Sequence, residues 1–362
     1  MEIVMITDLY PVCENEKNTP RTLWDFVESW RNSGHRVSVI KPNFILNSFV
    51  RKKPFYKSGE YEDVLNLNFW LPFMGNFSRY KKSDDAIYIA HMPSGILFAD
   101  RMGVPFVAGI HQSDIDVLTK PLYKFYFGKR LLKALRNSRA IACRSFVLKK
   151  KLLGLYPEFE SKTFVCPSGI DEEKIIQKEF KPLSEKIKVL TVARFKKRKN
   201  IDKVIEAVKS LESFELTVVG DGENKKYLEN LASNCKKITF TGTLSNDEVL
   251  EKMRSSDIFI LPSVNETFGM VYLEAMASGC VTVGTIDDGV DGIIKNGENG
   301  FLIKSETDEI KNILNYIKNA DEDSLKALHE KSFSTICNYT KQKCCEEYLQ
   351  QILRFCKDLT TS

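Results

Sequence analysis

The stretch SDIFILPSVNETFGMVYLEAMASG, residues 256–279, passes from a buried strand through a polar loop into a helix. Its apolar run 258–261 has the length and composition of a strand in a parallel sheet. We expect the following helix to start at about Thr267 or Phe268. A loop in this position lies at the carboxyl end of a strand, where open α/β sheets bind their ligands.

The same alternation of short apolar runs and longer amphipathic stretches extends over most of the chain, and it is typical of parallel α/β units. A polar, proline-containing stretch at 181–188 interrupts it and a second series of strands follows. Two successive Rossmann-like halves joined near residue 183 are the simplest architecture. We predict strands at 3–7, 36–40, 86–90, 105–110, 140–143, 163–166, 189–192, 215–219, 238–241, 258–261 and 281–284, and helices at 23–32, 202–211, 225–234 and 341–359.

Length and composition favour a soluble globular protein. The chain has 362 residues, of which 43% are hydrophobic and 28% charged, so collagen-like, disordered and disulfide-scaffold classes are excluded. No apolar run reaches eighteen residues, and the N-terminal sequence MEIVMITDLYP lacks the features of a secretory signal. The nine cysteines are odd in number and form no CxxC pair, so we expect reduced thiols and a cytoplasmic protein.

Positive charge is concentrated in the first half of the chain. Residues 1–180 carry 27 basic and 20 acidic side chains, whereas 181–362 carry 26 and 28. The stretch 120–151 contains eleven Lys or Arg, no Asp or Glu, and interleaved Leu, Phe and Tyr. It fits either a peripheral contact with an anionic membrane surface or a soluble helix pair with a solvated face. Nucleic-acid binding is not expected, because the net charge of +5 is modest and no recognition motif is present.

The loop at 262–270 predicts an anion site. Backbone N–H groups of Phe268, Gly269 and Met270 would point toward an anion at the helix N-terminus, and Gly269 allows close approach. Glu266 precedes the helix and Glu274 lies inside it. The alternative is a favourable acidic residue at a helix N-terminus together with an unrelated surface glutamate.

Glu266 and Glu274, with seven residues between them and Phe-Gly at the helix start, resemble the E-x7-E motif of retaining family 4 glycosyltransferases (group 1), which have the GT-B fold. The resemblance implies that Glu266 contacts the donor sugar and that Glu274 binds the ribose hydroxyls. It also places Thr267 with the donor-binding backbone.

The segment VLTVARFKKRKN strengthens this resemblance. Arg194 and Lys199 match the family's basic pair, whose role is to neutralise the leaving nucleotide diphosphate. Ala193 and Asn200 stand where the family usually has glycine. We expect Arg194 to be embedded at the strand end, whereas a solvated basic turn is the alternative for Lys196, Lys197 and Arg198.

Two further segments of the second half match the family in order. LTVVGDGENKKYLENLA resembles its strand–GDG–helix segment, which contains Gly220 and Gly222. ITFTGTLSNDEV resembles its F-x-G loop, and the resemblance implies that main-chain groups around Gly242 and Leu244 contact the base. A later stretch, DDGVDGIIKNGENGFLI, carries Gly292 where the family usually has glutamate.

The first half carries the acceptor site in this family. His111, in FVAGIHQSDID, resembles a family histidine beside the donor sugar and the reacting centre, and Asp114 belongs to the same element. His91 matches another family histidine, with a packing role as the alternative. The loop YPVCENEKNTPRT lacks the family's Gly-Gly pair, and Thr19 and Arg21 stand near the expected position.

The resemblance therefore implies a GT-B glycosyltransferase with two Rossmann-like parallel-sheet domains facing an interdomain cleft. The N-terminal acceptor domain is expected at 1–182, with the helix of 341–362 crossing back to it, and the donor domain at 183–340. A hexose or hexosamine would pass from a nucleotide diphosphate sugar to a hydroxyl of a glycan or polyprenyl-linked acceptor, with retention, in the synthesis of a bacterial surface polysaccharide. No cofactor and no metal are expected, and Asp287–Asp288 is not a metal-binding pair. A nucleotide-sugar 2-epimerase and an inactive sugar-nucleotide-binding protein are the alternatives.

Overall fold

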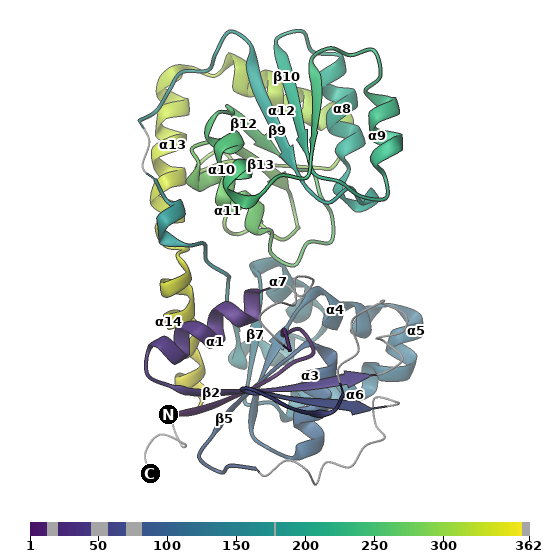
Figure 1. Ribbon diagram of the computed structural model, residues 1–362, viewed down its shortest axis with the longest axis vertical. Helices are drawn as coiled ribbons and strands as arrows, with labels where there is room; N and C mark the ends of the chain where they lie inside the picture. Colours follow the sequence, from purple (N-terminus) through teal and green to yellow (C-terminus); the bar gives the residue numbers. More distant parts are fainter. Residues whose placement is uncertain (13–20, 45–56, 70–81, 177–178, 357–362) are drawn as a thin grey trace. The chain divides into compact units, whose positions relative to one another are not determined.

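The computed structural model describes residues 1–12, 21–44, 57–69, 82–176 and 179–356 (Figure 1). Its contacts divide the chain into two compact units. The first contains Met1–Arg144, Leu148–Pro167 and Lys341–Ser362, and the second contains Ser145–Val147 and Ser168–Thr340.

An eight-stranded sheet forms the centre of the first unit, and all its described pairings are parallel except that of β3 with β4. Six of its strands lie at predicted positions, whereas β3 and β4 were not predicted. The order across the sheet is β3 (Gly59–Tyr61), β4 (Val64–Phe69), β2 (Arg36–Phe44), β1 (Glu2–Ile6), β5 (Ile87–His91), β6 (Phe106–Ile110), β7 (Ala140–Cys143) and β8 (Thr163–Val165).

Alternate residues of these strands enter two different cores, because successive side chains of a strand point to opposite faces. Val4 and Ile6 of β1 pack with α3 (Met92–Met102), α4 (Gln112–Thr119), α6 (Lys129–Asn137) and α7 (Phe146–Leu155). Ile3 and Met5 pack on the other face with α1 (Thr22–Asn32) and α14 (Lys341–Phe355). Helices therefore cover both faces, as apolar parallel strands require.

Helix α14 completes the first unit although it follows the second unit in the sequence. It lies beside α1 (Figure 1). The Trp30 indole of α1 donates a hydrogen bond to the Cys345 carbonyl at 3.0 Å. The rings of Phe26 and Trp30 both contact Tyr348, with centroids 5.1 and 5.6 Å from its ring.

The second unit is built on a six-stranded, fully parallel sheet. Five of its strands were predicted, and β14 was not. Helices α8 (Ile201–Lys209), α9 (Lys225–Leu231) and α12 (Thr307–Asn319) cover one face, and α10 (Asn246–Arg254) and α11 (Met270–Ala277) the other (Figure 1). The strand order is β11 (Ile238–Gly242), β10 (Phe214–Val219), β9 (Ile187–Val192), β12 (Ile258–Ile260), β13 (Val281–Thr285) and β14 (Phe301–Ile303).

Residues 168–182 lie with the second unit, whereas the sequence analysis placed the boundary after residue 182. Ile170 forms a parallel bridge with Thr340, and Lys174 makes an ion pair with Glu274. Phe180 packs against the core of the second sheet. These contacts join the segment to the second unit before the strand β9 begins.

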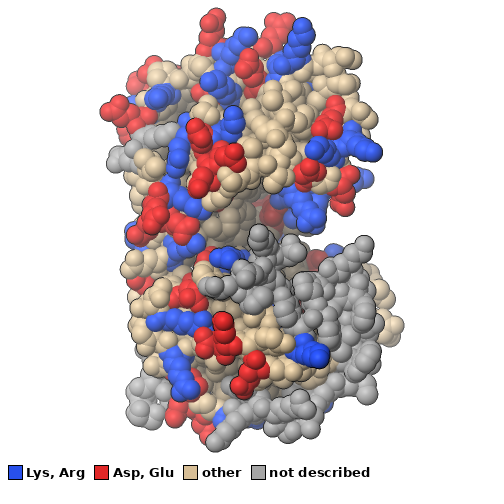
Figure 2. All heavy atoms as spheres, viewed as in Figure 1, with Lys and Arg blue, Asp and Glu red and all other residues tan. Residues whose placement is uncertain are grey.

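The face shown in Figure 2 carries acidic and basic side chains interspersed over the second unit, so that face has no large field of one sign. Within the described residues, no helix is long and apolar enough to cross a bilayer.

Candidate active site

Three neighbouring strands of the second sheet bring charged residues to one edge. The segments after β9, β12 and β13 carry Lys199, Glu266 and Asp288. Because these strands are adjacent and parallel, their carboxyl ends lie together. The two residues predicted from separate motifs, Lys199 and Glu266, meet there as an ion pair.

The Glu266 carboxylate is the centre of this cluster. Its Oε1 accepts hydrogen bonds from Arg198 Nη1 at 2.7 Å, from Ser263 Oγ at 2.8 Å and from Lys199 Nζ. Burial acts to raise the pKa of Glu266, but the neighbouring Lys199 and Arg198 outweigh it and hold the pKa below its ordinary value. The carboxylate is therefore ionised at neutral pH. Arg198, for which a solvated turn was the alternative, is part of the cluster.

Asp288 stabilises the conformation of the loop that carries Glu266. Its carboxylate accepts the backbone N–H groups of Asn265 at 2.5 Å and of Glu266 and Gly289 at 2.7 Å. Asn265 has a φ of 60°, a conformation that asparagine tolerates better than most residues. The sequence analysis considered Asp288 only to exclude metal binding, and this positioning role was missed.

The helix after the loop begins at Met270, so the predicted start at Thr267 or Phe268 is wrong. Gly269 is its N-cap with a φ of 96°, which turns the chain before the first helical residue. Phe268 is buried, whereas Thr267 and Met270 are partly exposed. The N–H groups of Met270 and Val271 have no acceptor within the helix, as at every helix start, and form the anion-binding end.

Glu274 lies in the second turn of α11 and is paired with a cation. Its Oε1 is 3.5 Å from Lys174 Nζ, which is also 3.4 Å from a carboxylate oxygen of Asp171. Only 16% of the Glu274 side chain is exposed, so it is not an unrelated surface glutamate. Lys174 was not predicted, because its segment matches no motif.

Arg194 differs from its expected environment. It is exposed, two residues beyond the end of β9, and its side chain has no hydrogen bond or ion pair within the described part of the chain. The strand ends at Val192, so Arg194 belongs to the loop and not to the apolar strand. Asn200, at the other end of the loop, has a φ of 50° and so adopts the conformation that the family's glycine provides.

Gly220 and Gly222 allow the next loop to pack on the Arg194 segment. A Cβ on Gly220 would lie 1.9 Å from the Ala193 carbonyl oxygen, and one on Gly222 would lie 2.7 Å from the backbone nitrogen of Phe195. Phe195 N–H in turn donates to the Asp221 carbonyl at 2.8 Å. The two glycines therefore allow this loop to pack directly against the backbone on either side of Arg194.

The predicted base-contacting residues lie at the end of the edge strand β11 and in the loop after it. Gly242 ends β11 with a φ of 75°, and its carbonyl accepts the Gly220 N–H at 2.9 Å. Leu244 is partly buried against the core that contains α11.

In the first unit, a chain of buried polar side chains joins β5, β6 and α14. His91 Nδ1 lies 3.0 Å from His111 Nε2, and His91 Nε2 lies 3.0 Å from the Tyr348 hydroxyl. Burial lowers the pKa of His91 well below its ordinary value and, with the nearby Arg144, lowers that of His111 to about 3. Both imidazoles are neutral at physiological pH. The two contacts form one continuous chain, in which each neutral imidazole can donate through one ring nitrogen and accept through the other.

The other predicted residues of the first unit have different surroundings. Asp114 is fully buried in the first turn of α4, where its Oδ2 accepts the His111 backbone N–H at 2.8 Å. Burial raises the pKa of Asp114 well above its ordinary value. Arg21 is the N-cap of α1 and stacks over the Trp24 ring at 5.1 Å. Thr19 lies outside the described residues.

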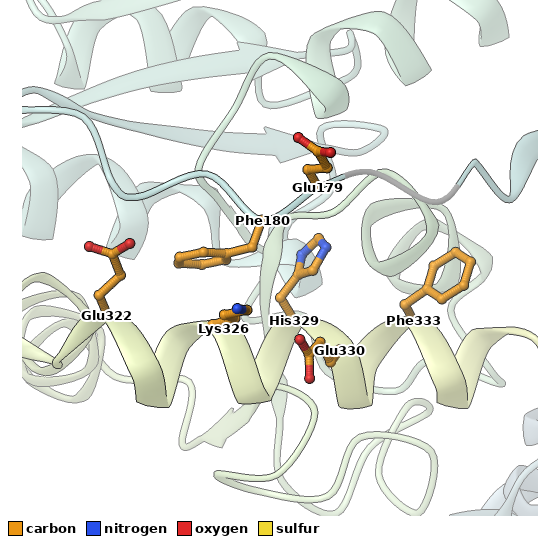
Figure 3. A pocket seen from close by; sticks show the side chains of 7 residues that line it. All are labelled: Glu179, Phe180, Glu322, Lys326, His329, Glu330 and Phe333. Atoms are coloured by element: carbon orange, nitrogen blue, oxygen red, sulfur yellow. The ribbon is translucent and has the colours of Figure 1, made fainter.

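A separate pocket of about 490 Å³ opens between α13 (Glu322–Ile336) and the segment before β9. Figure 3 shows Phe180 and His329 facing each other there, with ring centroids 6.0 Å apart. Glu179, Glu322 and Glu330 outnumber Lys326 among its charged groups. This acidic lining does not suit a nucleotide diphosphate. In the described ranges, no group of three or more His, Cys, Asp or Glu side chains is arranged to hold a metal ion.

Residues 171–333 match the family described as Glycosyl transferases group 1. No curated protein sequence matches the chain.

Solved structures resemble this chain over nearly its whole length at low sequence identity. Sucrose-phosphate synthase from Thermosynechococcus elongatus shares 15% identity over 100% of each chain, with a TM-score of 0.72. Anabaena HepE in complex with UDP shares 15% over 98% of this chain and 100% of the other, with a TM-score of 0.71. The lipopolysaccharide outer core galactosyltransferase WaaB shares 15% over 98% and 99%, with a TM-score of 0.72. The predicted fold class, an α/β protein with two parallel-sheet domains of the GT-B type, is confirmed.

Proposed function

We propose that this protein, a glycosyltransferase with the GT-B fold, moves a hexose or hexosamine from a nucleotide diphosphate sugar to a hydroxyl of a glycan or lipid-linked acceptor, with retention of anomeric configuration. The observation that carries the proposal is the cluster in which Lys199 and Arg198 contact the Glu266 carboxylate. It lies within the region that matches the glycosyltransferase family.

The charges of this cluster suit a diphosphate. Lys199 and Arg198 supply two cations, and the N–H groups at the start of α11 supply neutral donors for phosphate oxygens. Arg194 is exposed, so it is accessible to an anion from solvent. A structure similar to this chain was solved in complex with UDP, which supports a nucleotide donor.

The two glutamates have separate roles in the proposal. All three hydrogen bonds of the Glu266 carboxylate reach Oε1, and among the described residues Oε2 has no hydrogen-bond partner. Oε2 is therefore the atom that accepts a hydroxyl of the donor sugar. Glu274, one turn inside α11, binds the ribose hydroxyls, and Lys174 forms an ion pair with its carboxylate.

The chemistry needs no nucleophile from the enzyme. The glycosidic bond from the sugar to the diphosphate breaks, and the acceptor hydroxyl attacks from the same face. A leaving phosphate oxygen accepts the proton of that hydroxyl. Lys199 and Arg194 stabilise the negative charge that develops on the diphosphate, and such electrostatic stabilisation is usually the largest single contribution to catalysis. His111, neutral because of its low pKa, acts as a hydrogen-bonding partner for the sugar and not as a cation.

The acceptor side is proposed from the first unit. His91, Asp114, Thr19 and Arg21 remain candidates there, with His91 and Asp114 acting through His111. A role in bacterial surface polysaccharide synthesis, at the inner face of the cytoplasmic membrane, is supported by the likeness to the WaaB structure. No metal or cofactor is proposed.

Donor binding is the first test. The protein and its Glu274→Ala variant are heated with UDP-, GDP- and ADP-sugars, and one nucleotide class is expected to raise the Tm of the native protein but less that of the variant. If no nucleotide sugar stabilises the native protein, the assigned donor site is wrong.

Turnover is the second test. Lys199→Met and Arg194→Met are expected to lower transfer by about two orders of magnitude, whereas the exposed control Lys196→Met should stay near the native rate. Conversion of the donor to an epimer without acceptor would indicate a 2-epimerase instead. Tight donor binding with no transfer or hydrolysis would indicate an inactive binding protein.

A further inference from the structure

Residues Pro121–Tyr123, Lys124–Gly128 and Lys129–Asn137 form one continuous helical segment of the first unit, called here the 121–137 helix. It consists of α5, a π-helical turn and α6. Its second half is an amphipathic helix, with Leu131, Ala134 and Leu135 buried in the core that α6 shares with α3.

The outward face of this helix is basic. Lys129, Arg130, Lys133 and Arg136 are all exposed, at positions between those of the buried residues. No acidic residue occurs from 120 to 151. Within the described part of the chain, Lys120 forms an ion pair with Asp116 and Arg136 forms one with Glu158.

The first half of the helix is exposed and rich in apolar side chains. Every residue from 119 to 126 is exposed, and Leu122, Phe125 and Tyr126 expose 66%, 81% and 59% of their surfaces. The Phe125 and Tyr126 rings contact each other edge to face, 5.2 Å between centroids. Scattered exposed apolar residues are ordinary, but a contiguous group of this kind marks an interaction site.

We propose that the 121–137 helix docks this protein on an anionic lipid bilayer surface. Leu122, Phe125 and Tyr126 enter the boundary between headgroups and acyl chains, and the lysines and arginines of the outward face contact the anionic headgroups. An apolar end beside a basic, acid-free face is the composition of helices that lie in a membrane interface. The inference goes beyond the transfer reaction proposed above and stands without it.

Charge and shape favour this partner over others. A second copy of the same surface would bring two basic faces together, which like-charge repulsion opposes. Single-stranded nucleic acid binds by stacking its bases on aromatic faces in a basic groove. Here one of the three exposed apolar side chains, Leu122, has no ring for a base to stack on. The three side chains also lie on the exposed end of a helix and not in a groove.

Vesicle flotation with the full chain tests the proposal, without any nucleotide sugar. The probes are vesicles of phosphatidylcholine alone and of three parts phosphatidylcholine to one part phosphatidylglycerol. Binding is expected only to the anionic vesicles, and high salt should weaken it. Because no donor is present, this result is independent of the donor-binding test.

Two double variants separate the apolar and the basic contributions. One variant combines Leu122→Ser with Phe125→Ser, and the other combines Lys129→Glu with Lys133→Glu. Each is expected to weaken vesicle binding about tenfold or more. The matched control, Lys226→Glu with Tyr227→Ser, changes an exposed lysine and a 54% exposed tyrosine on α9 and should bind as the native protein does. Native circular dichroism and Tm confirm that each variant is folded.

Three results overturn the proposal: no flotation of the native protein with anionic vesicles, equal binding to both vesicle types, or unchanged binding of the two double variants. Sedimentation velocity and a single-stranded RNA titration accompany the assay. Self-association or RNA binding that the same variants abolish, without flotation, would assign the surface to that other partner.

Discussion

Replacing Glu266 by Gln tests the charge balance of the cluster with little change of shape. The amide keeps an oxygen that can accept from Ser263, but it removes the negative charge that Arg198 and Lys199 share. The Lys199 side chain is only 13% exposed, so water solvates its ammonium poorly once the carboxylate is gone. Loss of these charge-assisted bonds should cost about 2–3 kcal/mol of unfolding free energy.

The same substitution should strengthen the binding of a nucleoside diphosphate. In the native protein the carboxylate repels the diphosphate and competes with it for the same two cations. A unit charge about 6 Å from an anion, at an effective dielectric constant of about 40, contributes about 1.4 kcal/mol, or about tenfold in Kd. Turnover should fall by about two orders of magnitude, because the donor sugar loses its partner at Oε2. Affinity for the product and rate should therefore change in opposite directions.

Isothermal titration of the nucleoside diphosphate that matches the preferred donor measures the affinity, with Glu274→Gln as the contrasting variant. That variant should bind more weakly, since its carboxylate is assigned to the ribose. Denaturant unfolding measures stability. The native pKa of Glu266 is depressed, so its contribution is present above the ordinary carboxyl pKa and is lost as the pH falls below it. The stability difference between native and Glu266→Gln proteins should shrink accordingly.

An unchanged or weaker affinity of Glu266→Gln for the nucleoside diphosphate would refute this reasoning. The carboxylate and the diphosphate would then not share Lys199 and Arg198. A stability difference that persists at acid pH would show that the substitution acts through packing instead of charge.

Three further outcomes are expected. Asp288→Ala removes three charged hydrogen bonds to the loop backbone and should lower the unfolding free energy by about 3 kcal/mol or more, measured in urea. In Gly109→Ala the new methyl group would lie 2.0 Å from His91 Nδ1, so nitrogen NMR of the imidazoles should show the bond from His91 to His111 lost. The pKa of His111 is about 3 in the folded protein and about 6.5 in the unfolded chain. Between these two pH values the unfolded state binds more protons, so the free energy of unfolding decreases as the pH is lowered. When the pH is lowered from 6.5 to 4.5, the native protein should therefore lose about 2–3 kcal/mol more unfolding free energy than His111→Gln. The raised pKa of Asp114 has the opposite effect, but that effect is common to both proteins. Equal losses would contradict a buried, neutral His111.

Strands such as β5, β6 and β13 could be predicted because each is a short apolar run that is buried on both faces. Runs such as 189–192 and 281–284 begin and end within a few residues of β9 and β13. The neighbouring order of β9, β12 and β13 then brings Lys199 and Glu266 together as an ion pair, a contact that the sequence analysis did not predict. A local sequence pattern is enough to predict a site residue where the residue's position is set by one strand and the loop that follows it.

Other parts of the site depend on contacts that no local pattern contains. Tyr348 lies 257 residues from His91, and its helical segment has no motif. Arg198 belongs to a basic run in which sequence does not distinguish a paired side chain from a solvated one. The helix start at Met270 depends on the φ of Gly269, because a glycine adopts such a conformation or a helical one with similar ease. β3 has only three residues, too few for a periodic pattern, whereas the alternation of apolar and polar residues in β4 was present and was missed.

The position of α14 in the first unit also determines the order in which the molecule can be completed during synthesis. Residues 168–340 of the second unit have all been made before α14 emerges, so that unit can fold while the first still lacks one of its helices. Until then Trp30 has no Cys345 carbonyl to bond, and Phe26 has no Tyr348 ring. The first unit therefore cannot be completed until α14 has been made, and a ribosome that stalls before residue 341 holds a first unit whose apolar α1 face lacks its partner helix.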